Sequence, residues 1–130
     1  MTLAAYMAEI EARPWSWGSH DCCTFLAGWV MARGNPDPME FIRDRYDSER
    51  SALRRIREGG GLERLWMRGM IEAGVPEADE PRAGDVGVIR ATTVDGINEA
   101  CGIYTGDRWL TLGLRGIECG PAELIMVWRP

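Results

Sequence analysis

The sequence contains no lysine and only one histidine, so its fifteen basic residues are all arginines. We interpret the missing lysine as a trace of a GC-rich genome, because arginine and lysine are interchangeable on most solvated surfaces. The formal net charge of −5 gives no electrostatic support for nucleic-acid binding, so we expect no nucleic-acid partner. The lone histidine, His20, is the only imidazole on which catalysis could draw.

Long apolar runs are also missing. No segment approaches the ~20 consecutive apolar residues of a membrane-spanning helix. Residues 1–12 alternate apolar and acidic residues and lack the basic start and apolar core of a signal peptide. We therefore expect synthesis in the cytoplasm and no membrane span. The 130 residues, 45% of them hydrophobic and 27% charged, predict one globular domain over 1–130.

Cysteine is scarce too, and the four that occur fit no zinc-finger spacing: Cys22, Cys23, Cys101 and Cys119. The adjacent pair at 22 and 23 is not expected to form a disulfide, because the geometry of a vicinal bridge is strained. For Cys23 and Cys119 the simplest interpretation is a buried free thiol.

Apolar residues at helical spacing predict helices in the first part of the chain. Thr2 caps the first and Asp47-Ser48 the third. Gly34 follows the second, and the glycines at 59–61 join the third to the fourth. The arginines of the third helix look like a solvated face, and Ile71 belongs to the apolar stripe of the fourth. The predicted helices cover about 2–12, 21–33, 48–58 and 62–74.

The pattern changes after residue 83, where short β-type runs alternate with turn residues. The runs at 86–89, 101–104, 108–112 and 124–128 predict strands. Turns are expected at Asp95-Gly96, at 105–107 and at 113–116. Helices over about 1–76 followed by an antiparallel sheet over about 83–130 predict an α+β fold, with one helix packed on the sheet.

The stretch 14–25 organises this prediction, because two tryptophans and a Ser-His-Asp run lead into the cysteine pair. A thiol in the first turn of a helix feels the positive end of the helix dipole, which lowers its pKa and favours a nucleophilic thiolate. Trp15 and Trp17 are two residues apart, so in an extended segment they share one side. They form either a lid over the core or an aromatic wall of a groove.

Several motifs in this order give the chain a family likeness. Trp17-Gly18 precedes Asp21-Cys22, Ala83-Gly84-Asp85-Val86 follows, and Gly102-Ile103-Tyr104 comes later. The pattern resembles the NlpC-type papain-like cysteine peptidases, which cleave peptide crosslinks of bacterial cell walls. The resemblance implies a papain-like fold, with Cys22 at the start of a helix packed on the sheet.

The likeness is greatest to a compact phage and prophage branch of that superfamily, and it extends over nearly the whole chain. The further matching segments are Pro14, residues 34–38, Arg45-Tyr46, residues 60–62 and Trp128-Arg129. Proteins of this branch are encoded among the tail genes of long-tailed phages, next to components of the tail-tip hub. The resemblance therefore implies a virion protein with tail-hub partners.

The chain departs from the family pattern at the residue that would act as the general base. The position that carries the catalytic histidine corresponds to Ala100, and alanine cannot take the thiol proton of Cys22. His20 is the candidate substitute for this base. The alternative interpretation is a structural loop histidine that is hydrogen-bonded to Ser19 or to a backbone carbonyl. Glu99 would favour the neutral thiol. Thr111, at the family's next polar position, could orient a histidine but not replace one.

The same alignment brings Cys101 near Cys22. Ala100 and Cys101 face opposite sides of a regular strand, so Cys101 is core if Ala100 faces the groove. A one-residue bulge would reverse this, and Cys22 and Cys101 could then share a metal, an iron–sulfur cluster or a disulfide. Without supporting spacing, we expect no cofactor.

The sequence thus favours a tail-tip or baseplate structural or assembly protein with a degenerate peptidase fold and no enzymatic activity. The expected groove is lined by Trp15, Trp17, Asp21, Ala100 and Thr111. Two alternatives stay open. One is an active cysteine hydrolase of peptidoglycan stem peptides, with Cys22 as nucleophile and either His20 or a side chain of a partner protein as base. The other is a module that binds cell-wall peptides without cleaving them.

Overall fold

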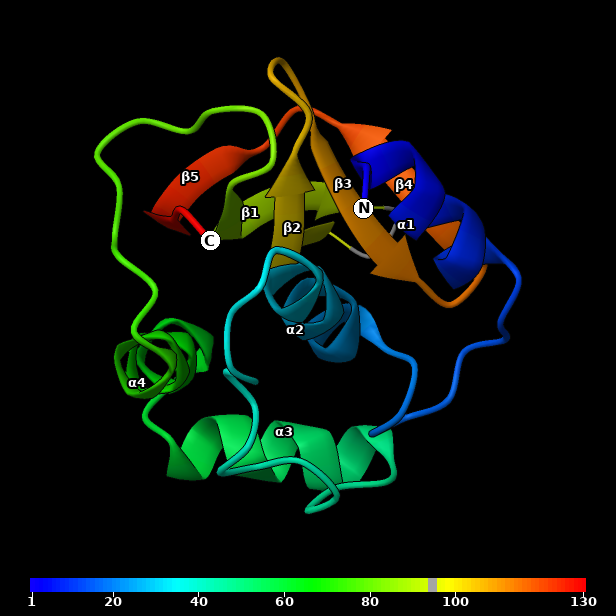
Figure 1. Ribbon diagram of the computed structural model, residues 1–130. Helices are drawn as coiled ribbons and strands as arrows, with labels where there is room; N and C mark the ends of the chain where they lie inside the picture. Colours follow the sequence, from blue (N-terminus) through cyan, green and yellow to red (C-terminus); the bar gives the residue numbers. More distant parts are fainter. Residues whose placement is uncertain (94–95) are drawn as a thin grey trace.

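The computed structural model describes residues 1–93 and 96–130 and has an α+β architecture (Figure 1). All helices of the described chain precede its sheet, as predicted. The helices are α1 (Leu3–Glu11), α2 (Cys22–Ala32), α3 (Glu49–Glu58) and α4 (Leu62–Ala73). The strands are β1 (Val86–Thr93), β2 (Gly96–Tyr104), β3 (Trp109–Gly113), β4 (Gly116–Gly120) and β5 (Glu123–Trp128). The predicted turn at Asp95-Gly96 includes Asp95, which lies outside the described residues.

The sheet is antiparallel in every pairing, in the order β4-β3-β2-β1-β5. The first four strands form a meander, and β5 returns to pair with β1 at the other side. Strand β4 was not predicted, because it is a short edge strand between glycines with no strong apolar alternation. The β1–β2 register is regular, with Val88 opposite Cys101 and Ile89 opposite Ala100. Consequently no bulge reverses the faces of β2 at this point.

The helix starts follow the local capping signals in the sequence. Thr2 accepts a hydrogen bond from the Ala5 amide at the start of α1. Asp21 and Ser48 form capping boxes at α2 and α3, each with a hydroxyl residue three positions later. Gly74 ends α4 in the left-handed conformation that glycine adopts at least cost.

Helix α2 is the centre of the fold and lies against the middle of the sheet (Figure 1). Its buried residues are Phe25, Leu26, Ala27, Trp29 and Val30. Helix α1 lies beside the β3–β4 side of the sheet, and α3 lies beyond α2, away from the strands. The sheet face toward α2 contributes Val86, Val88, Cys101, Ile103 and Leu110 to the main core. The opposite face carries a smaller cluster around Ile89, Trp109 and Val127.

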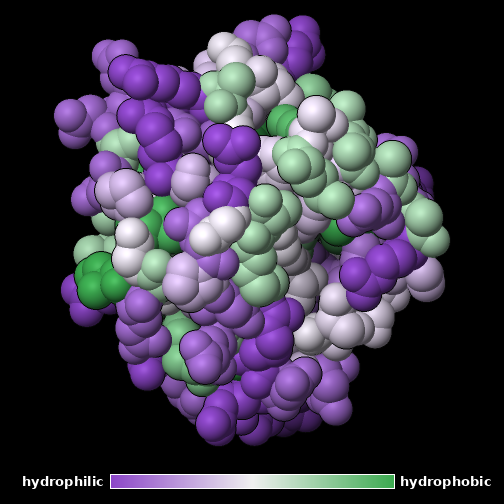
Figure 2. Space-filling view, viewed as in Figure 1, coloured by the Kyte–Doolittle hydropathy of each residue, from purple (hydrophilic) through white to green (hydrophobic). Residues whose placement is uncertain are grey.

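The surface seen in Figure 2 is mainly hydrophilic, with small hydrophobic groups between polar side chains. Ile71 is 74% exposed, so the prediction that it belongs to the apolar stripe of α4 is wrong. The buried residues of α4 are Leu62, Trp66, Gly69, Met70 and Ala73, which occupy one helical face that excludes position 71. Within the described ranges, no helix combines the length and apolar character needed to cross a bilayer.

Candidate functional site: a three-cysteine cluster

The Trp-Gly-x-x-Asp-Cys motif builds the start of α2. Asp21 is 2% exposed, and its Oδ1 accepts hydrogen bonds from the amides of Cys23 and Thr24 at 3.0 and 2.9 Å. Its Oδ2 accepts from the Gly18 amide at 2.8 Å. Gly18 has a φ of +86°, and a Cβ there would overlap the carbonyl oxygen of Tyr46. The motif therefore needs glycine and aspartate for structural reasons.

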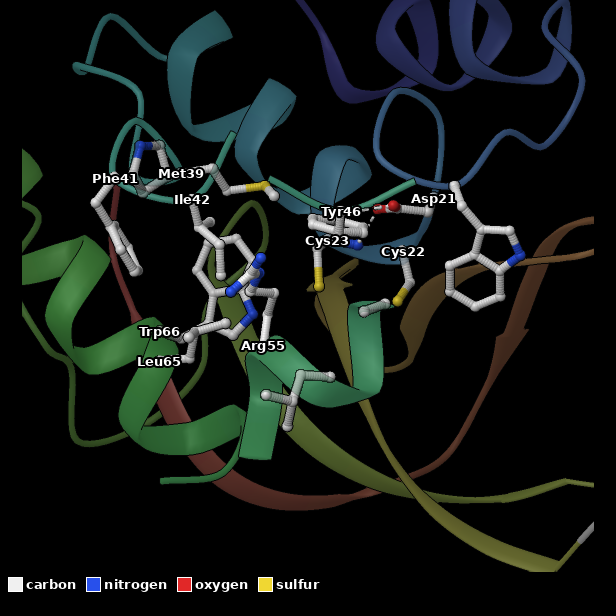
Figure 3. Close-up of a pocket in the computed structure, with 14 residues that line it drawn as sticks. Asp21, Cys22, Cys23, Met39, Phe41, Ile42, Tyr46, Arg55, Leu65 and Trp66 are labelled. Atoms are coloured by element: carbon white, nitrogen blue, oxygen red, sulfur yellow. Dashed lines mark hydrogen bonds between the residues drawn. The ribbon is translucent and has the colours of Figure 1, made fainter. Parts of the chain in front are cut away.

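A second segment of the family pattern, Arg45-Tyr46, packs against the same turn, residues 18–21, at the start of α2; we call this group of residues the Asp21 corner. The Tyr46 hydroxyl donates to Asp21 Oδ2 at 2.7 Å (Figure 3). Burial raises the pKa of Tyr46 well above its ordinary value, and the Asp21 carboxylate that accepts its hydrogen bond raises it further. Tyr46 thus stays protonated as a donor, and both Asp21 oxygens are occupied. Asp21 acts as a helix cap and leaves no carboxylate oxygen free for catalysis.

The chemical feature of the site is a cluster of three sulfurs from Cys22, Cys23 and Cys101, all within 4.8 Å of one another. Cys22 and Cys23 come from the first turn of α2, and Cys101 comes from the buried face of β2. The Sγ atoms of Cys23 and Cys101 are 3.6 Å apart. Trp66 of α4 donates its indole N–H to Cys101 Sγ at 3.0 Å. All four cysteines of the chain are free thiols.

The pKa values of the three thiols are shifted in different directions. Hydrogen bonds from Cys101 and then Cys23 hold the pKa of Cys22 well below its ordinary value, against the effect of burial. Hydrogen bonds with Cys101 and then Cys22 raise the pKa of Cys23, and burial raises the pKa of Cys101. The cluster therefore favours one thiolate, on Cys22, that accepts hydrogen bonds from two neutral thiols. The direction agrees with the prediction for Cys22, but its first cause is the neighbouring thiols and not the helix N-terminus.

A narrow cavity of about 50 Å³ opens beside the cluster (Figure 3). Its walls are almost entirely apolar and include Cys22, Cys23, Met39, Tyr46 and Trp66. The volume suits an ion or a few waters and is far below the roughly 300 Å³ or more of pockets that enclose a drug-sized ligand. A stem peptide therefore does not fit inside it.

The two tryptophans of the preceding loop combine both predicted roles. Trp15 and Trp17 stack edge-to-face with ring centroids 4.9 Å apart, and both pack on the main core. Trp17 lines the cavity, as a groove wall would. Trp15 instead lies at a separate hollow beside β4, together with Arg13 and Leu114. Only Trp17 of this pair therefore lines the candidate site.

His20 does not serve the cysteines. Its side chain is 2% exposed and its Nε2 lies 3.0 Å from the carbonyl oxygen of Ile10, in α1. Burial lowers the pKa of His20, and the nearby charge of Arg13 lowers it further. This placement matches the predicted loop histidine bonded to a backbone carbonyl. His20 is not among the residues that line the cavity at Cys22.

The positions taken from the family pattern face the other way. Ala100 packs on the small cluster of Ile89, Trp109 and Val127, on the sheet face opposite the cysteines. Thr111 alternates with the core residues Leu110 and Leu112 and also faces away from α2. The prediction that Ala100 and Thr111 line one groove with Cys22 is therefore wrong. Glu99 is exposed and faces Arg90, with 3.9 Å between their charged atoms.

Two predictions about cysteine burial also need correction. Cys119 is exposed because it lies on the edge strand β4, and Cys23 is half-buried because it lines the cavity. Cys101 is both a core residue and close to Cys22, although the β1–β2 pairing is regular and β2 needs no bulge to bring the two thiols together. Tyr46 and Trp66 were not identified as parts of the site. Tyr46 carried a signal in the Arg-Tyr motif, whereas Trp66 looked like an ordinary core residue of α4.

Comparison with known proteins gives one match, to a family model described as Domain of unknown function (DUF6950), over residues 1–129. The chain therefore belongs to this family. No curated protein and no solved structure matches the chain.

Proposed function

We propose that this member of the DUF6950 family is a non-hydrolytic relative of the NlpC-type papain-like peptidases that serves as a structural or assembly protein of a phage tail tip. It would be made in the host cytoplasm, enter the virion and contact the tail hub or neighbouring baseplate proteins. The motif likeness described above supports the family relation, and an α+β fold with Cys22 at the start of a sheet-packed helix is compatible with it.

One observation supports the proposal that the protein does not hydrolyse peptides. The only imidazole of the chain, that of His20, is hydrogen-bonded to the carbonyl oxygen of Ile10, away from Cys22. A cysteine peptidase needs a base that takes the thiol proton and returns it to the leaving amine. Ala100 lacks a titratable group, and its place on the opposite sheet face would turn even a histidine away from the sulfur. The position that does face the cysteines is occupied by Cys101.

The test combines an activity assay with localisation. We expect purified protein to release no muropeptides from peptidoglycan, with the same background for wild type and Cys22→Ala. We also expect the protein in purified virions, where it co-purifies with a hub component. Muropeptide release that depends on Cys22, in a protein absent from virions, would refute the proposal.

A second candidate function is hydrolysis of peptidoglycan stem peptides during phage entry. The observation that favours it is the thiolate character of Cys22, whose pKa is held low by two neighbouring thiols. A base would then have to come from a partner protein, because His20 is occupied. Cys22-dependent release only in the presence of the hub would support this candidate, and no release in that mixture would exclude it.

A further inference from the structure

We propose that Cys22, Cys23 and Cys101 form a binding site for one soft, thiophilic metal ion, with monovalent copper preferred over zinc. The inference does not depend on a role in the phage tail. It rests on the donor set, on the spacing of the three sulfurs and on the cavity beside them.

The spacing of the sulfurs suits a single ion. With metal–sulfur bonds of ~2.3 Å, the sulfurs of a planar three-coordinate site lie ~4.0 Å apart. The three Sγ atoms already lie within 4.8 Å of one another, and those of Cys23 and Cys101 are 3.6 Å apart. Small side-chain rotations are therefore enough to close the site around an ion. Two ligands come from a helix start and one from a strand, so the folded core holds the geometry.

The donor set selects a soft ion. Thiolates favour Cu(I), zinc and iron–sulfur clusters, whereas hard cations require oxygen ligands. The nearest carboxylate, that of Asp21, is occupied on both oxygens, and the only histidine is bonded to Ile10. Zinc prefers four ligands in a structural site. Cu(I) is stable with three sulfurs, and the thioether of Met39 lines the same cavity.

The surroundings supply the outer contacts that metal sites require. The Trp66 indole N–H donates to Cys101 Sγ at 3.0 Å, which fixes this sulfur and offsets part of the negative charge of a bound thiolate. The amides of the first turn of α2 place positive partial charge beside the pair at 22 and 23. The small apolar cavity gives an ion access while excluding larger ligands. Each thiol that binds the metal releases its proton to solvent.

The experiment uses the full chain, reduced and free of oxygen, titrated with Cu(I) in competition with a chromophoric Cu(I) chelator. We expect one equivalent to bind, with a thiolate-to-copper absorption band and an X-ray absorption spectrum that shows sulfur ligands only. A parallel titration with Zn²⁺ should give weaker binding relative to a zinc chelator of matched strength. Failure to bind Cu(I), nitrogen or oxygen ligation, or a preference for zinc would overturn the proposal.

Variants assign the ligands. Cys22→Ser and Cys101→Ala should each weaken Cu(I) binding at least ~100-fold, because loss of an outer-shell contact alone typically costs 10- to 100-fold. Cys119→Ser, at the exposed cysteine of β4, is the matched control and should bind as wild type does. Trp66→Phe replaces the indole by a smaller aromatic ring without an N–H donor, and should weaken binding about tenfold.

Circular dichroism of each variant separates lost ligation from lost folding. Cys22 is partly exposed, so Cys22→Ser tests the site even if the buried Cys101→Ala does not fold. A folded Cys22→Ser protein that binds Cu(I) like the wild type would contradict the assignment. Loss of binding in Cys119→Ser would contradict it as well. If Cu(I) does not bind, while added oxidised glutathione takes two electrons from the thiols and leaves a Cys23–Cys101 disulfide, the cluster is a redox pair and the metal proposal fails.

Discussion

Asp21 and Asp85 are both buried carboxylates that stand just before a core element, and they are stabilised in different ways. Asp21 has only neutral donors: the amides of Gly18, Cys23 and Thr24 and the Tyr46 hydroxyl. Asp85 pairs with the Arg129 guanidinium, which donates from Nε at 3.1 Å and from Nη2 at 2.8 Å. The hydrogen bonds of Asp21 hold the start of α2, where Cys22 and Cys23 lie. The ion pair of Asp85 holds Arg129, near the end of the chain, against the start of β1.

The difference shows how a carboxylate can be buried without a cation. Four hydrogen bonds and the positive end of α2 take the place of a counterion at Asp21. At Asp85 a long cationic side chain with a partly exposed stem provides the charge. Asp21 therefore depends on the geometry of four neutral donors, whereas Asp85 depends on one cation, Arg129, and one amide, that of Arg82.

Asp21→Ala should give the largest effect. The substitution removes the α2 cap and leaves the buried Tyr46 hydroxyl and the Gly18 amide without their acceptor. We expect a loss of about 3–4 kcal/mol in the free energy of unfolding, measured by urea denaturation. Asp21→Asn retains one cap oxygen and should lose less. A loss below about 1 kcal/mol for Asp21→Ala would mean that the dipoles are not what stabilises this corner.

Asp85→Ala should cost less, about 1–2 kcal/mol, because the partly exposed Arg129 can be hydrated after its partner is removed. The Arg82 amide also loses its acceptor, Asp85 Oδ2. A double-mutant cycle with Arg129→Met isolates the coupling energy of the pair. Additive effects in that cycle would show that the two residues stabilise the fold independently and that the comparison with Asp21 is mistaken.

His20, the neighbour of Asp21, should make the stability of this part of the fold depend on pH. Burial lowers the pKa of His20 below its ordinary value of 6.5, so the unfolded chain binds this proton more readily than the folded protein. The stability contribution is complete above pH 6.5 and declines as the pH falls through 6.5 toward the folded pKa. Urea unfolding of wild type and His20→Gln should diverge over this range. Parallel curves would refute the prediction.

Glu123→Gln should have the smallest effect on stability. It is the exposed reference with which the losses at the buried Asp21 and Asp85 are compared. Its side chain is 68% exposed and lies 3.3 Å from Arg90 across the β1–β5 pair. Water screens such a pair, so we expect a change below about 0.5 kcal/mol, which shrinks further at high salt. A loss as large as that of Asp85→Ala would show that burial is not the property that separates these carboxylates.

Much of the helical half could be predicted because its signals are local. Thr2, Asp21 and Ser48 cap their helices as their side chains dictate, and Gly34, Gly60 and Gly74 have the positive φ that ends a helix or turns the chain. The sheet was harder. Strand β4 depends on pairing with β3 and has no marked pattern of its own, so Cys119 was placed in the core when it lies on an exposed edge.

The features of the candidate site likewise fall into those that local sequence determines and those that depend on the tertiary structure. The sequence by itself determined that Cys22 starts a capped helix, because Asp21 and Thr24 beside it form the capping box. The low pKa of its thiol depends first on Cys101, which only the tertiary structure brings close. Only the tertiary structure decided which face of β2 meets that helix. The regular pairing with β1 turns Cys101 toward the pair and Ala100 away, since neighbouring strand residues point to opposite faces. Contacts between segments about 80 residues apart depend on register, which local sequence does not encode.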